Sequence, residues 1–158
     1  MATIKSSEKI TSDVLVIGLI KKNGKSVVAT SASSVDVKKI QQLVDDVGAS
    51  AKYDDVTKIP FGSPKLVVTT GLGEKEITPE TLRRAAGAAS RALVGYKSAD
   101  FALPTKNSQD AAAVAEGAAL GAYNFTEFRG STLKDQKDPL TSITIISKSA
   151  NKAALNRA

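Results

Sequence analysis

Short runs of apolar and β-branched residues recur along the chain, and longer amphipathic stretches separate them. These runs occupy residues 13–20, 66–70, 99–103 and 141–147, and a polar Asn-Gly turn after the first leads into a return strand over residues 25–30. Continuous apolar runs of this length are typical of strands that are covered on both faces. Their alternation with amphipathic helices predicts a three-layer α/β sandwich, with a mixed, mainly parallel sheet and helices on both faces.

The stretch 65–97 carries the clearest local signals, because it predicts a strand, a turn and a helix in succession. The apolar run 66–70 leads into Gly71-Leu72-Gly73, which we expect to end the strand. Thr78 is the predicted N-cap of the helix, and Pro79 suits the first helical position. The apolar residues that follow at helical spacing are Leu82, Ala85, Ala86, Ala89 and Leu93.

Two further helices are indicated by caps and periodicity. Asp36 is a predicted N-cap, and Gly48 is well placed to end the same helix. An Ala-rich stretch at residues 109–123 predicts another helix, capped by either Asn107 or Ser108.

Two segments between these elements have weaker patterns. Residues 49–64 contain two prolines and an Asp-Asp doublet, so we expect a loop there, with a short edge strand at residues 51–53. Residues 124–139 form a polar connector to the last strand.

Composition limits the possible chemistry. A length of 158 residues suits one domain, and an aromatic content of 4% predicts an aliphatic core. The chain has neither Cys nor His, which excludes disulfides, thiolate metal sites, Ser-His-Asp or Cys-His catalysis and the HExxH zinc motif. The apolar run at 14–20 is too short to cross a bilayer and lacks the flanks of a secretory signal. We therefore expect a cytoplasmic protein with no membrane association.

Positive charge is in moderate excess and partly local. The net charge is +6, from 22 basic and 16 acidic residues. From Arg129 onward there are six basic residues against two acidic ones. A solvated surface is the favoured interpretation of this basic stretch, and contact with DNA phosphates is the alternative.

Arginines on the predicted helix after Pro79 are the strongest candidate binding residues. Arg83, Arg84 and Arg91 share this helix, and Glu80 precedes Arg84 by four residues, the spacing of an intrahelical ion pair. A solvated helix face is favoured. The alternative is a site for an anion or a contact with another subunit, to which Arg129 also contributes.

Other apparent motifs have plainer explanations. Gly71-Leu72-Gly73 lacks the third glycine of a dinucleotide fingerprint, because Glu76 stands there. The Asp-Asp doublets at 45–46 and 54–55 are interpreted as surface polarity, since adjacent carboxylates point apart. Glu116 is expected at the solvent edge of its helix or capping a loop. The aromatic residues at 123, 125 and 128 are expected to pack under a loop.

Two sequence stretches support a family resemblance. GLGEKEITPETLRRAAGAASRAL at residues 71–93 and EGAALGAYNFTEFR at residues 116–129 resemble the N-terminal domain of the leucyl aminopeptidase family. The resemblance implies a macro-domain-like fold for residues 1–150 and the start of a linker helix at residues 151–158. It also implies that a catalytic domain follows in the parent protein, so that residue 158 is not the natural terminus.

What the resemblance implies about function lies largely outside this chain. The parent would be an exopeptidase that removes N-terminal amino acids with two divalent metal ions, manganese or zinc, and assembles as a homohexamer. The family's NTDAEGR-type metal-binding region is absent here, so we expect no catalytic, cofactor-binding or metal-binding residue in this chain. The domain would contact its own catalytic domain and neighbouring subunits, helping assembly and active-site access, and alone would be a monomer or weak oligomer. The alternatives are a DNA-binding module and, ranked last, an ADP-ribose-type binding module.

Overall fold

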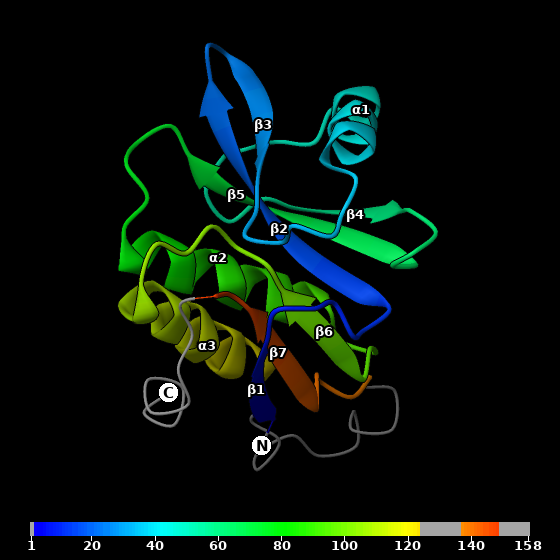
Figure 1. The fold of residues 1–158 in the computed structure, drawn as a ribbon, viewed down its shortest axis with the longest axis vertical. Coiled ribbons are helices and arrows are strands. Elements are labelled where there is room, and N and C mark those ends of the chain that lie inside the picture. The colour runs from blue at the N-terminus through cyan, green and yellow to red at the C-terminus, as the bar shows by residue number, and fades with distance from the viewer. Residues whose placement is uncertain (1, 124–136, 149–158) are drawn as a thin grey trace, which may run out of the picture.

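The computed structural model describes residues 2–123 and 137–148. Within these ranges it contains seven strands and three helices (Figure 1). The strands are β1 (Thr3–Ser7), β2 (Val14–Lys22), β3 (Lys25–Ala29), β4 (Val56–Pro60), β5 (Leu66–Gly73), β6 (Ser98–Phe101) and β7 (Ser142–Ile146). The helices are α1 (Val37–Val47), α2 (Pro79–Ala92) and α3 (Ser108–Ala122).

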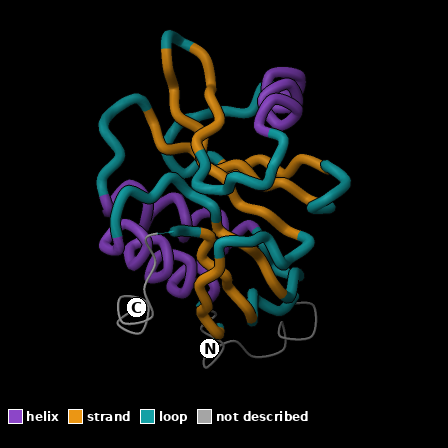
Figure 2. Tube along the Cα trace, in the orientation of Figure 1, coloured by secondary structure: helices purple, strands orange, loops and turns teal. Residues whose placement is uncertain are grey.

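All seven strands belong to one mixed sheet. Its order is β1-β7-β6-β2-β5-β4, and β3 pairs with β2 outside this path. Four neighbouring pairs are parallel, namely β1–β7, β7–β6, β6–β2 and β2–β5. The pairs β4–β5 and β2–β3 are antiparallel. Figure 2 shows the β2–β3 hairpin projecting beyond the rest of the sheet. The predicted mixed, mainly parallel sheet is therefore confirmed.

Helices cover both faces of this sheet. Along β2, Val14 and Val16 belong to the core that also contains the buried faces of α2 and α3. Leu15, Ile17 and Leu19 belong to a second core with the buried residues of α1. Because successive side chains of a strand point to opposite faces, α2 and α3 lie on one side of the sheet and α1 lies on the other. This arrangement confirms the α/β sandwich.

The three helices begin at the caps that their sequences indicate. The side chain of Asp36 accepts a hydrogen bond from the Lys39 amide at 3.1 Å, and Gly48 ends α1 in the left-handed conformation. The Thr78 hydroxyl caps α2, with Pro79 in its first turn. At α3 the choice between two caps is resolved, because Asn107 Oδ1 accepts from the Asp110 amide at 2.9 Å.

One predicted strand was wrong, and one strand of the sheet was missed. Residues 51–53 are not a strand, the edge strand being β4 at Val56–Pro60, and the N-terminal strand β1 was not predicted. The strand β5 also continues through Gly73 rather than ending before Gly71.

The glycines at the end of β5 explain this difference. A Cβ atom built on Gly71 would lie 2.6 Å from the Lys52 carbonyl carbon, so only glycine lets the preceding loop lie against the strand here. The Gly71 amide donates to the Asp55 carbonyl at 2.9 Å, and the Gly73 amide donates to the Ala51 carbonyl at 2.8 Å. Gly71 therefore accommodates protein backbone and Gly73 the Tyr53 ring, in agreement with a structural rather than a dinucleotide-binding interpretation.

Helices α2 and α3 pack unusually closely at glycines. A Cβ on Gly117 would lie 2.7 Å from the carbonyl carbon of Arg83 and 2.9 Å from its Cα, and closer still to its carbonyl oxygen. A Cβ on Gly121 would lie 2.8 Å from the Cα of Gly87. The backbones themselves are therefore in contact, and a shallow groove runs along the outside of the helix pair.

Candidate functional site

The groove outside α2 and α3 brings together three of the four arginines singled out in the sequence. It has a volume of about 210 Å³. The fourth arginine, Arg129, lies outside the described residues. The lining residues are Asp54, Glu80, Arg83, Arg84, Gly87, Arg91, Gly117 and Leu120.

Arg83 links the two helices through carboxylates. Its Nη2 atom lies 2.7 Å from Glu116 Oε2 on α3, and its Nε atom donates to the same oxygen at 2.8 Å. Its Nη1 atom pairs with Glu80 one turn earlier on α2. The hydrogen bonds to Glu116 and then to Glu80 raise the pKa of Arg83 above its ordinary value. Glu116 therefore lies at the solvent edge of α3, as expected, and serves there as the partner of an arginine.

Arg84 pairs with a different carboxylate from the one predicted. The spacing on the helix favoured Glu80, but Glu80 pairs with Arg83, and the Arg84 guanidinium pairs with Asp54 in the loop before β4. This hydrogen bond to Asp54 raises the pKa of Arg84, and the guanidinium carbon lies 5.7 Å from the centre of the Tyr53 ring. The prediction of a Glu80–Arg84 pair was thus wrong, because tertiary contacts supply both arginines with other partners.

The end of the groove near Arg91 and Leu120 combines a cation with an exposed apolar side chain. Among the described residues, Arg91 has no ion-pair partner, and the neighbouring Leu120 side chain is 70% exposed. Three carboxylates lie on or beside the groove, but they pair with only two of its arginines, Asp54 with Arg84 and both Glu80 and Glu116 with Arg83. Such a surface suits contact with another protein segment better than capture of a free anion.

The donor atoms needed for a metal centre do not come together in the part of the chain that the structure describes. There, no group of three or more Asp and Glu side chains is arranged to hold an ion. The described residues do not fit a two-metal hydrolytic site, and no catalytic step can be derived through one from them.

A buried carboxylate that the sequence analysis missed has a structural role. Asp100 on β6 is fully buried. Its Oδ2 atom accepts hydrogen bonds from the amides of Thr11 and Ser12, and its Oδ1 atom accepts from the Ser12 hydroxyl at 2.7 Å. Asp100 thereby fixes the segment that leads into β2. A single Asp within a strand gave no signal of this contact.

The carboxyl ends of β6 and β7, where open α/β sheets usually bind ligands, are largely occupied by protein. The Ser31 amide donates to the Ala102 carbonyl at 3.1 Å, and the Thr30 hydroxyl donates to the same oxygen at 2.7 Å. The hydroxyls of Thr105 and Ser147 lie 2.8 Å apart and bridge the two strand ends. The loop after β3 therefore covers this edge.

Within the described ranges, no helix combines the length and the apolar character that a bilayer crossing requires.

Comparison with solved structures supports the fold. A tomato leucine aminopeptidase mutant superposes with a TM-score of 0.72 at 15% identity, over 99% of this chain and 35% of the tomato chain. The bottromycin maturation enzyme BotP superposes with a TM-score of 0.62 at 23% identity, over 92% of this chain and 29% of its own. At these identities the likeness establishes the architecture alone.

Sequence comparison establishes the family. A probable cytosol aminopeptidase of Streptomyces coelicolor is 43% identical over an alignment of 141 positions, which covers 82% of this chain and 27% of that protein. Its counterpart from Streptomyces avermitilis is 38% identical over an alignment of 174 positions, gaps included, which covers 94% of this chain and 34% of that protein. The chain thus spans about a quarter to a third of the length of these relatives. The family model for the N-terminal domain of the cytosol aminopeptidases matches residues 14–132, and the chain therefore belongs to this family.

Proposed function

We propose that this chain is the non-catalytic N-terminal domain of a larger, metal-dependent leucyl aminopeptidase. The observation that carries the proposal is the family match over residues 14–132, in a chain that spans only 27–34% of its relatives. The side chains support it further, because neither His nor Cys is present and the described carboxylates do not converge on a metal-sized site. Peptide hydrolysis, with two manganese or zinc ions, would then reside in the remainder of the parent polypeptide.

The mass of the native protein tests the link to a larger parent. This chain has a mass of 16.4 kDa, and relatives of which it spans 27–34% are about three to four times as long. An antibody against this domain should capture from its source a polypeptide of that larger size, as measured by intact-mass spectrometry. Capture of a 16.4 kDa polypeptide alone would contradict the proposal.

The role that we propose for the domain is to assist assembly of a homohexamer and to shape access to the active sites. The groove between α2 and α3 is the surface that we assign to this role. It presents an exposed leucine beside an arginine without a carboxylate partner among the described residues, and the glycine contacts beneath it hold the two helices in a fixed relation. Leu120 would provide the apolar contact, and Arg91 would pair with a carboxylate of a neighbouring subunit or of the catalytic domain.

Substitutions in the full-length parent test this assignment. Leu120→Asp combined with Arg91→Glu should reduce the hexamer to smaller species in sedimentation analysis. Val47→Asp on α1 is the matched control, because Val47 is also an exposed apolar residue, at 54%, but lies on the other side of the sheet. A hexamer that survives the double substitution would refute the assignment of this groove.

A further inference from the structure

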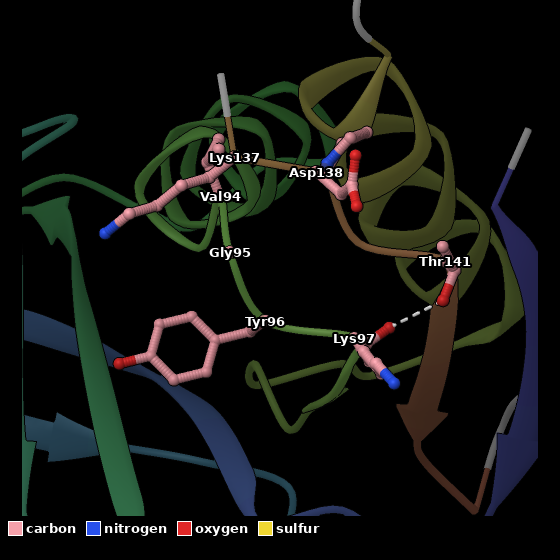
Figure 3. A pocket seen from close by; sticks show the side chains of 8 residues that line it. Val94, Gly95, Tyr96, Lys97, Lys137, Asp138 and Thr141 are labelled. Atoms are coloured by element: carbon pink, nitrogen blue, oxygen red, sulfur yellow. Dashed lines mark hydrogen bonds between the residues drawn. The ribbon is translucent and has the colours of Figure 1, made fainter. Parts of the chain in front are cut away.

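A second hollow lies just beyond the C-terminal end of α2, where the chain turns into β6. It has a volume of about 610 Å³ and is formed by two segments, residues 94–97 and residues 137–141. The Gly95 amide donates to the Asp138 carbonyl at 2.7 Å, and the Thr141 hydroxyl donates to the Lys97 carbonyl at 3.0 Å (Figure 3). The two walls are thus joined by hydrogen bonds, and the volume falls in the range of small-molecule sites.

Two lysines lie beside this hollow, one at Tyr96 and one at Gly95. The Lys58 ammonium, from β4, lies 5.4 Å from the centre of the Tyr96 ring. The Lys137 stem crosses Gly95, where a Cβ atom would lie 3.0 Å from Lys137 Cδ. Figure 3 shows the Lys137 side chain and the Tyr96 ring extending to the same side of Gly95, whereas the Lys97 ammonium points to the other side.

The lysine side chains beside the hollow form no ion pairs with the residues that the structure describes. None of the ion pairs found in residues 2–123 and 137–148 involves Lys58, Lys97 or Lys137. In the groove on α2 and α3, two of the three arginines, Arg83 and Arg84, are paired with carboxylates. Lys58 at the Tyr96 ring and Lys137 over Gly95 thus have no ion-pair partner among the described residues, and the Asp138 carboxylate also lines the hollow.

We propose that the hollow beside Tyr96 binds the phosphoryl group of a small phosphomonoester. A phosphomonoester carries nearly two negative charges at neutral pH and accepts several hydrogen bonds, which matches two ammonium groups and the Tyr96 hydroxyl donor. A carboxylate would neutralise only one of the two lysines. The hollow has room for the organic part of the ligand along Val94 and Pro139.

Titration followed by ¹⁵N–¹H NMR tests this site with phenyl phosphate as the probe. Saturable shifts should concentrate on the amides of Gly95, Tyr96 and Lys137. Lys58→Met and Lys137→Met should each weaken binding by about tenfold, because each removes a charge-assisted contact. Lys97→Met is the matched control, since it removes the same charge from the same hollow, and it should weaken binding less than twofold.

Comparison of probes identifies the phosphate source. Inorganic phosphate should bind at the same amides, and a short DNA duplex, which offers only singly charged phosphodiesters, should bind there more weakly per phosphate. The proposal is overturned by shifts spread evenly over surface lysines, by an equal effect of the Lys97 substitution, or by tighter binding of the duplex. Absence of saturable shifts with phenyl phosphate would overturn it as well.

Discussion

The backbone contact between α2 and α3 leads to the most specific stability prediction. Gly117→Ala adds one methyl group where the protein has no room for it, because the new Cβ would lie 2.7 Å from the carbonyl carbon of Arg83 and 2.9 Å from its Cα. These atoms are backbone within a helix and cannot move aside alone. The two helices would have to separate by roughly 0.5–1 Å, which weakens the dispersion contacts along their interface.

Two opposing terms set the magnitude. Alanine is a better helix former than glycine by about 1 kcal/mol, which favours the variant. Overpacking in a rigid interface costs about 1–3 kcal/mol and sometimes more, and here the contact is with backbone, which places the cost at or above the upper end of that range. We therefore expect a net loss of roughly 2 kcal/mol, or about 4–8 °C in the melting temperature for a domain of this size.

Urea unfolding monitored by circular dichroism measures this loss, and the same helix pair offers the control. A Cβ on Gly87 would meet its nearest neighbours at 3.3 Å, namely the flexible end of Arg91 and the carbonyl oxygen of Gly117. Gly87→Ala should accordingly change the free energy of unfolding by less than about 1 kcal/mol in either direction. A Gly117→Ala domain as stable as the parent domain, or as its Gly87→Ala counterpart, would refute the close-packing argument.

Three further predictions concern side-chain contacts. Asp100→Asn places an amide where a buried carboxylate accepts hydrogen bonds from two backbone N–H groups and a hydroxyl. The substitution should lower the free energy of unfolding by about 2–4 kcal/mol in the same assay, and a loss below about 1 kcal/mol would contradict this. Glu116→Gln removes the charge of one partner of Arg83, in an ion pair whose side chains are about one-third exposed. Because solvent screens the pair, the coupling free energy in a double-mutant cycle should be about 0.5–1 kcal/mol, and zero coupling would count against the contact. The Lys21 ammonium, 2.7 Å from Glu74, lowers the pKa of that carboxyl through its hydrogen bond. The resulting stabilisation is therefore present above the unfolded-state pKa and is lost as pH falls through the folded-state value. Lys21→Met should raise the Glu74 pKa in an NMR titration, and an unchanged value would disprove the contact.

Local chemistry explains which parts of the fold could be predicted. Thr78 and Pro79 fixed the start of α2 because capping depends on residues within one turn. The buried strands β2 and β5 were evident because both of their faces are covered, so apolar residues run without interruption. The strand β1 was missed because it lies at the sheet edge, largely exposed, and its sequence TIKSS has no apolar run.

The contacts of the candidate site depend on tertiary structure, and they were therefore harder to predict from the sequence. Arg84 and Asp54 are 30 residues apart, and only the packing of the loop before β4 against α2 brings them together. Likewise, Glu116 meets Arg83 because glycines allow α3 to approach α2 closely. The spacing of charges within one helix could not indicate either pair.

The central claim is that the chemistry of peptide hydrolysis lies outside this chain. Turnover of leucine p-nitroanilide by the purified chain, with Mn²⁺ or Zn²⁺ supplied, tests it most directly. The account predicts hydrolysis no faster than in buffer with the same metal, alongside ready turnover by the full-length parent in the same assay. Metal-dependent release of p-nitroaniline that co-purifies with the 158-residue chain would contradict it.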